Sequence, residues 1–232
     1  MKKPLIIAAA LIPFCVGAAN AVVVPGASNP WLAGMPPGST AGGDVAPAES
    51  PVLVSGLTLS AGQVLTFGVT GSVSHTPAPS GLSPDGGGFT SHLAGAQNGI
   101  ATLTAPFDSL IGVFLDAAQP DTSPAPAGLN FLTLGTSFAS LSPLLKQPFF
   151  IGDGLTGTGT GAVQDFIVPS GATRLFLGTM DAFGWFDNSG SFDVTVNGAP
   201  TPPSVPEPAT LTLFATALAA FSLLRRRWAA PN

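Results

Sequence analysis

The stretch GTMDAFGWFDNSGSFDVTVN, from Gly178 to Asn197, holds the residue types best suited to binding chemistry in this chain. Asp181, Asp187 and Asn188 offer three hard oxygen ligands close together. Ca²⁺ takes about six to eight oxygens from carboxylates, amides and backbone carbonyls, so the spacing predicts a calcium site. Asp-Asn-Ser-Gly is also typical of a plain hairpin turn, and a turn without metal is the alternative interpretation.

Aromatic side chains lie in the same stretch. Phe183 and Trp185, if exposed, would present a face to the apolar side of a sugar. If buried, the aromatic rings would pack over the edge of the domain, because they offer a large apolar area. The sequence leaves both interpretations open.

The chain lacks the residue patterns of common catalytic sites. It has two histidines, and neither a Gly-x-Ser-x-Gly nor a His-Glu-x-x-His pattern occurs. The glycine-rich run GLTGTGTGAVQ, residues 154–164, lacks the lysine of a phosphate-binding loop and is better suited to a hairpin connection. We therefore predict a protein that is not an enzyme.

Acidic residues outnumber basic ones, 12 to 7. Between residues 22 and 198 only Lys146 and Arg174 are basic, against eleven acidic side chains. Such a surface repels phosphate backbones, so we expect no nucleic-acid partner.

The N-terminus has the pattern of a secretory signal peptide over residues 1–21. Two lysines precede a short apolar run that ends in Ala19-Asn20-Ala21, and this small-x-small ending predicts cleavage after Ala21 by the export machinery. The only cysteine, Cys15, lies in this segment. The mature protein would therefore contain neither disulfides nor thiolate metal sites.

The C-terminus, VPEPATLTLFATALAAFSLLRRR, predicts a membrane anchor. Residues 209–224 are mostly apolar and would span about 24 Å as a helix, somewhat less than the roughly 30 Å hydrocarbon layer. The arginines that follow would stop transfer and stay cytoplasmic. We predict a proline-rich linker over 199–208, a transmembrane helix with its arginine stop over 209–227, and a tail over 228–232.

This tail resembles the PEP-CTERM sorting signal, also catalogued as an ice-binding protein C-terminal domain. The resemblance rests on the Pro-Glu-Pro motif, the apolar helix and the terminal arginine cluster, that is on Pro206, Glu207, Pro208, Arg225, Arg226 and Arg227. It implies an exosortase as partner, transient anchoring in the inner membrane, and delivery to the cell surface or extracellular matrix of a Gram-negative bacterium. A plain C-terminal anchor is the alternative.

Strand patterns dominate between these signals. Clear alternation in QVLTFGVTG and SFDVTVN, and dense apolar runs in LIGVFLD and TRLFLGTM, are separated by Gly, Pro, Asp and Ser clusters. They predict an all-β, jelly-roll-like antiparallel β-sandwich over 52–198, preceded by an irregular segment over 22–51. Long loops are expected at 75–99 and 117–128, and one short helix within 137–147.

The body also resembles the calcium-dependent galactose-binding bacterial lectins. The likeness rests on IVPSGATRLFLGTMD and DNSGSFDVTV, and upstream on LTLSAGQVLTFGVTGSVSHTP. It implies a jelly roll in which Asp181, Asp187, Asn188 and the backbone carbonyl of His75 hold a calcium ion that bridges to sugar hydroxyls. If a gap is allowed, Thr90 or His92 falls near the place of the histidine that contacts the sugar in these lectins. The loop is one residue shorter than in the lectins, and residues 117–165 have no equivalent in them.

Two hypotheses follow. The first is an exported, sorted protein that binds Ca²⁺ and an extracellular polysaccharide. The second is a purely structural matrix protein without a small ligand.

Overall fold

The computed structural model describes residues 20–76 and 81–198. Strands dominate this part of the chain and helices are short, as the predicted all-β class requires. The rest of the predicted signal peptide, the linker, the transmembrane helix and the tail lie outside the described residues. Within the described residues no helix is long and apolar enough to cross a membrane.

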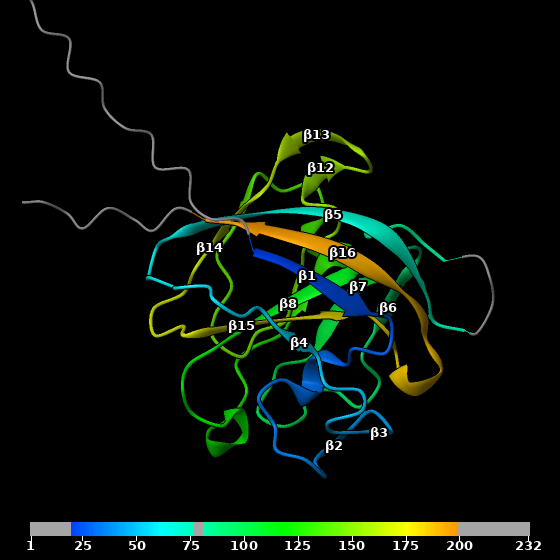
Figure 1. Cartoon of the computed structure of the whole chain (residues 1–232), viewed down its shortest axis with the longest axis vertical. Coiled ribbons are helices and arrows are strands. Elements are labelled where there is room, and N and C mark those ends of the chain that lie inside the picture. The colour runs from blue at the N-terminus through cyan, green and yellow to red at the C-terminus, as the bar shows by residue number, and fades with distance from the viewer. Residues whose placement is uncertain (1–19, 77–80, 199–232) are drawn as a thin grey trace, which may run out of the picture. The chain divides into compact units, whose positions relative to one another are not determined.

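Two main sheets build the body (Figure 1). The larger has the order β1-β16-β5-β14-β10, with strands Asn20–Pro25, Ser189–Asn197, Val64–Ser74, Asp165–Ile167 and Ser140–Leu141. The other has the order β11-β8-β15-β4, with strands Phe149–Phe150, Leu110–Leu115, Arg174–Thr179 and Val52–Leu53.

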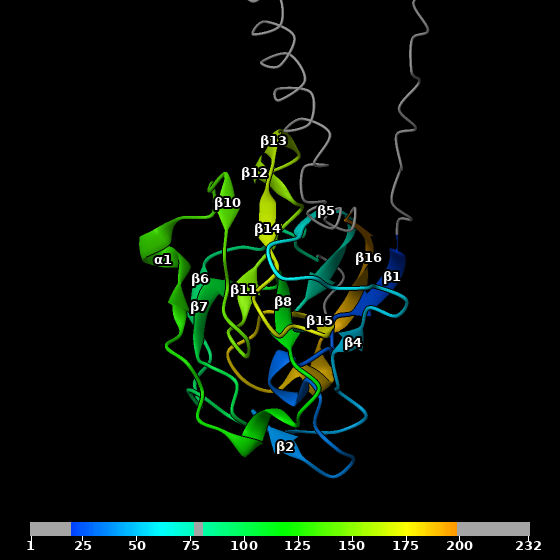
Figure 2. The same cartoon turned by 90° about the vertical axis from the view of Figure 1, so that its left-hand side faces the viewer.

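Smaller pairings surround these sheets (Figure 2). A three-stranded sheet has the order β6-β7-β9, with strands Phe89–Ser91, Leu103–Pro106 and Leu129–Asn130. Two hairpins pair β2 with β3 and β12 with β13, with strands Thr40–Ala41, Asp44–Val45, Leu155–Gly157 and Thr160–Val163. The β12–β13 hairpin is the connection that the glycine-rich run predicted.

The hydrophobic pattern explains both main sheets. In β16, Phe192, Val194 and Val196 are buried and alternate with more exposed residues, which places one face of the strand on the core. Every residue of β8 is buried, as expected for a strand covered on both faces. Buried side chains of both sheets form one apolar cluster, so the sheets share a core.

The N-terminal segment is less irregular than predicted over 22–51, although turns and loops make up most of it. Its start forms β1, which runs antiparallel to β16 over six residue pairs. A 3₁₀ helix, η1 (Pro30–Leu32), follows and is capped by the Asn29 side chain, which accepts from the Trp31 backbone N–H at 2.9 Å. Trp31 is fully buried. The β2–β3 hairpin then brings the chain to the site described below (Figure 1).

The prediction of a helix within 137–147 was wrong. This stretch contains β10, which pairs with β14, and the Gln164 amide donates to the carbonyls of Thr136 and Phe138 at 2.8 Å each. These tertiary bonds hold the backbone extended. The only α-helix in the described part, α1 (Phe131–Leu134), lies just before it, and Asn130 caps it.

Two further differences concern the predicted antiparallel sandwich. The β10–β14 and β7–β9 pairs are parallel, each over two residue pairs, while the long pairings are antiparallel. The two predicted long loops contain short elements, β6 in the first and the 3₁₀ helix η2 (Pro120–Thr122) in the second. The jelly-roll topology itself stays a prediction.

Candidate functional site

The predicted ligands lie on the loop of residues 180–188, which joins β15 to β16. We call it the 180–188 loop. It includes the 3₁₀ helix η3 (Trp185–Asp187), which begins after Gly184 in the left-handed region at φ 80°. The Asn188 N–H donates to the Trp185 carbonyl at 3.0 Å and closes this turn. The loop lies at the N-terminal end of β16 (Figure 1).

Asp44 on β3 holds the middle of the 180–188 loop through hydrogen bonds to its backbone. This side chain is 2 % exposed and accepts three hydrogen bonds, from the Trp185 N–H at 3.0 Å, the Phe186 N–H at 3.1 Å and the Asn29 amide at 2.8 Å. Burial raises the pKa of Asp44, and these hydrogen bonds oppose the rise. Both carboxylate oxygens therefore have partners, and Asp44 is a structural clamp between the β2–β3 hairpin and the loop.

A buried aromatic stack lies beside this clamp. The His92 ring stacks on Trp31 with centroids 3.7 Å apart, and Trp185 packs against both rings at 5.5 and 5.8 Å. The indole N–H of Trp185 donates to the Thr179 carbonyl at 2.9 Å. Burial lowers the pKa of His92 to about 4, so the ring is neutral at neutral pH and donates from Nδ1 to the Gly95 carbonyl at 2.6 Å.

This stack corrects the sugar-binding interpretation of Trp185 and His92. They are 0 % and 3 % exposed, so neither ring has a face that a sugar could reach. Their apolar area is used in packing the core. Phe183, by contrast, is 56 % exposed, and so is its neighbour Phe186, at 66 %. These two phenyl rings are the exposed aromatic surface of the loop.

The predicted metal ligands differ in burial: Asp181 is buried, Asn188 is half-buried and Asp187 is exposed. Asp181 is 4 % exposed and accepts from the backbone N–H groups of Ala182 and Phe183, and the nearby Asn188 side chain acts to lower its pKa. Burial raises the pKa of Asp181, and these bonds together with the charge of His75 act against the rise. Asp187 is exposed on η3. The structure therefore brings Asp181 and Asn188 together, without Asp187.

A second carboxylate, which the sequence did not single out, joins this pair. Asp108 precedes β8 and is 1 % exposed, and its N–H donates to the Met180 carbonyl at 2.8 Å. Its Oδ2 lies 2.8 Å from the Nδ1 atom of His75. Burial raises the pKa of Asp108, and the bond to His75 opposes that rise. We call His75, Asp108, Asp181 and Asn188 the acidic cluster.

Two acceptor atoms of the acidic cluster are buried and have no hydrogen-bond partner among the described residues, Oδ1 of Asp108 and Oδ1 of Asn188. The amide nitrogen of Asn188 is used, since it donates to the Gly26 carbonyl at 3.3 Å. In the described part of the chain no three His, Cys, Asp or Glu side chains are placed to hold a metal ion. The amide oxygen of Asn188 and backbone carbonyls would have to complete the coordination shell of a metal ion, and Ca²⁺ accepts oxygen ligands of these kinds.

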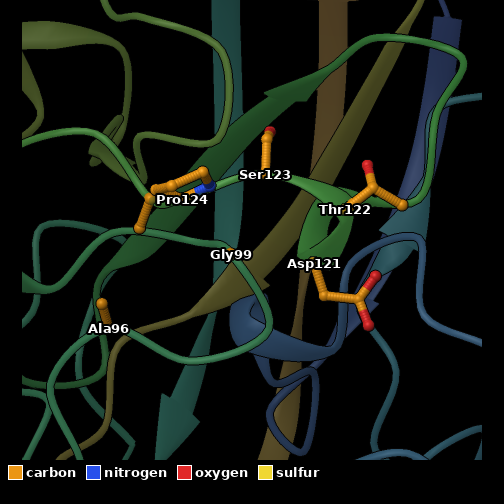
Figure 3. Close-up of a pocket in the computed structure, with 7 residues that line it drawn as sticks. Ala96, Gly99, Asp121, Thr122, Ser123 and Pro124 are labelled. Atoms are coloured by element: carbon orange, nitrogen blue, oxygen red, sulfur yellow. The ribbon is translucent and has the colours of Figure 1, made fainter.

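A separate hollow of about 460 Å³ opens between η2 and the loop before β7 (Figure 3). It is lined by Ala96, Gly99, Asp121, Thr122, Ser123, Pro124 and Ala125. The nearby cation Lys146 is already bound, donating to the carbonyls of Ser123 and Pro124 at 3.0 and 2.7 Å. With a single acid in its wall and that acid exposed, the hollow shows no built site.

Sequence reasoning missed two acids, Asp44 and Asp108. Each stands alone in its stretch, so local spacing gave no signal. Asp108 has φ 62°, a left-handed conformation that Asp tolerates better than most residues, but this is visible only in the structure.

Comparison with known families addresses the C-terminus. The PEP-CTERM protein-sorting motif matches residues 204–227, which contain the predicted Pro-Glu-Pro motif and arginine cluster. A search of the curated proteins finds no match to this chain. The motif implies that the protein is exported and sorted to the cell surface of a Gram-negative bacterium, with processing by an exosortase.

Proposed function

We propose that this exported protein is a surface or extracellular-matrix component that binds Ca²⁺ through the 180–188 loop and presents Phe183 and Phe186 to a polysaccharide. Before processing, the C-terminal helix would anchor it in the inner membrane. The observation that carries the calcium proposal is the pairing of buried Asp181 with Asn188, whose Oδ1 is buried and unpartnered among the described residues. An unmatched buried acceptor is costly unless a cation or water satisfies it.

A bound cation would also offset the cost of burying the carboxylates. Burial raises the pKa values of Asp181 and Asp108, which shows that both are poorly solvated as anions. A divalent ion would return the electrostatic stabilisation that water provides outside. It would then hold the start of β16 and the 180–188 loop in one geometry.

The charge of the body favours a neutral polysaccharide. Its two basic side chains are committed to backbone carbonyls, Lys146 near η2 and Arg174 to the carbonyls of Asp116 and Ala118 at 2.8 and 2.6 Å. A polyanion would therefore find few cations here, whereas exposed phenyl rings suit the apolar face of a pyranose.

Calcium binding is tested by calorimetric titration of the full chain in detergent with Ca²⁺ and by its melting temperature with Ca²⁺ or EDTA. We expect heat of binding, a higher melting temperature with Ca²⁺, and loss of both in Asp181→Ala. Asp193→Ala, an exposed acid on β16, is the matched control and should keep both. A wild-type chain indifferent to Ca²⁺ would remove the calcium proposal.

Polysaccharide binding is tested by retention of the full chain on columns of neutral glucans, galactans and mannans. Phe183→Ala should reduce retention, while Leu134→Ala, which removes an equally exposed apolar side chain on α1, should not. If no polysaccharide retains the wild type and Ca²⁺ has no effect, the alternative holds: a structural matrix protein whose core needs no ligand. The burial of Trp185 and His92 is the observation that favours this alternative.

A further inference from the structure

The acidic cluster contains a carboxylate that the predicted ligand set does not include. Asp108 is 1 % exposed, and one of its oxygens binds His75 while the other, Oδ1, is buried without a partner among the described residues. A half-satisfied buried carboxylate is unusual in a folded protein, because each unmatched charged acceptor keeps most of its desolvation cost. Its free oxygen is therefore available to a cation or a water molecule.

The backbone places Asp108 beside the loop ligands. The Asp108 N–H donates to the Met180 carbonyl at 2.8 Å, and the Met180 N–H donates to the Ser109 carbonyl at 2.9 Å. Met180, the residue before Asp181, is therefore hydrogen-bonded to the two residues that precede β8. His75 connects the two carboxylates, since it hydrogen-bonds Asp108 and its charge acts on the pKa of Asp181. The second unpartnered oxygen, Oδ1 of Asn188, belongs to the same group, since the Asn188 side chain lies near enough to Asp181 to lower the pKa of that carboxyl.

We propose that Asp108 is a ligand of the bound cation and takes the place that sequence spacing assigned to Asp187. This inference rests on the proposed calcium function and changes its ligand set to Asp108, Asp181 and Asn188. Two carboxylates and one amide oxygen are hard ligands, and backbone carbonyls and water would supply the remainder of a six- to eight-oxygen shell. Oxygen ligands of this kind select Ca²⁺ over Zn²⁺, which prefers nitrogen and sulfur.

His75 has a positioning role in this arrangement. Its ring holds Oδ2 of Asp108 and packs on Phe107 with centroids 4.5 Å apart, which leaves Oδ1 as the oxygen available to the ion. Partners of this type orient a ligating carboxylate, and their loss typically weakens metal affinity about 10- to 100-fold. Removing the ligand itself should weaken affinity at least as much.

The test is a Ca²⁺ titration of the full chain in detergent, carried out in parallel on Asp108→Asn, Asp187→Asn and Asp193→Asn. We expect Ca²⁺ affinity to fall by about 10- to 100-fold or more in Asp108→Asn and to stay within about 2-fold of wild type in the other two. Retained affinity in Asp108→Asn together with lost affinity in Asp187→Asn would overturn this inference and leave the calcium proposal standing. Absence of binding by the wild type would overturn both.

A measurement on the unmodified protein covers the case in which Asp108→Asn does not fold. In the ¹³C-labelled full chain, Ca²⁺ should shift the carboxylate resonance of Asp108 together with that of Asp181, while the resonances of Asp187 and Asp193 stay in place. An Asp108 resonance that ignores saturating Ca²⁺ while Asp181 responds would show that a water molecule, not the cation, satisfies Oδ1.

Discussion

The two sides of the 180–188 loop are held in different ways. Around Trp185, the clamp of Asp44 has a donor for each carboxylate oxygen, and the indole is fully buried with its N–H bonded. Around Asp181, the acidic cluster leaves two buried oxygens unpartnered among the described residues. The first side uses both oxygens of its clamp, although Nε2 of His92 is buried there without a partner among the described residues, and the second side leaves two oxygens for the proposed ion. Predictions on matched residues separate the two roles.

The largest effect on stability is expected on the Trp185 side of the 180–188 loop. Trp185→Ala removes a fully buried side chain and one hydrogen bond, and should lower the free energy of unfolding by about 3–5 kcal/mol. Urea unfolding followed by far-UV circular dichroism measures it. Phe186→Ala, at the next position but 66 % exposed, should change stability by no more than about 0.5 kcal/mol. Equal losses for both variants would contradict the distinction between a core ring and a surface ring.

The aromatic stack should also give the protein a pH dependence. The pKa of His92 is about 4 in the folded state against an ordinary 6.5, so the native state binds fewer protons than the unfolded state between these values. The contribution of neutral His92 to the free energy of unfolding is therefore fully present above about pH 6.5 and is lost as the pH falls toward 4. The whole difference is about 3 kcal/mol.

The measurement is urea unfolding at pH 7 and at pH 4 in wild type and in His92→Gln. The three acids with raised pKa values, Asp44, Asp108 and Asp181, titrate in the opposite sense but are common to both proteins, so they cancel in the comparison. The wild type should lose about 3 kcal/mol more than the variant on acidification. An identical pH response of the two proteins would show that His92 is not neutral in the core.

The same substitution on the two sides gives the sharpest contrast. Asp44→Asn turns an acceptor into a donor that faces backbone N–H groups, and should cost about 2 kcal/mol because one buried N–H loses its partner. The cost should be the same with Ca²⁺ and with EDTA. A calcium-dependent cost would mean that Asp44, rather than the acidic cluster, responds to the ion.

The smallest effect is expected for Asp181→Asn in EDTA. The amide oxygen can keep the bonds from Ala182 and Phe183, and the substitution removes a poorly solvated charge, so the free energy of unfolding should change by less than about 1 kcal/mol. In Ca²⁺ the variant should fall below wild type, because only the wild type gains stability from the bound ion. A large loss in EDTA would make Asp181 a structural residue like Asp44.

Local pattern predicted the long strands well. The alternation in β16 and β5 and the apolar runs in β8 and β15 appear as strands because each buries a continuous face or both faces. The local sequence pattern predicted the wrong structure where the conformation of the backbone depends on partners far along the chain. β1 is a strand because β16 lies beside it. β10 is not helical because β14 pairs with it and Gln164 binds the backbone just before it.

The candidate site shows the same division. Asp181 and Asn188 are close in sequence and meet in space, so spacing identified them. Asp108 joins them from a separate strand end, and its oxygen is left unpartnered by contacts that no local pattern contains. Tertiary packing, and not residue type, buries Trp185 and His92 and leaves Phe183 and Phe186 exposed.

The sequence alone indicated where this protein goes, because the sorting motif is recognised from the type and order of its residues over 204–227. It also determined the strand-rich class, since side-chain alternation is a property of the chain itself. The tertiary structure alone decided which acids lie together, which rings are exposed and which oxygens lack a partner. These depend on contacts between segments far apart in sequence, and burial changes the energy of a charge or a ring far more than its neighbours in the chain do.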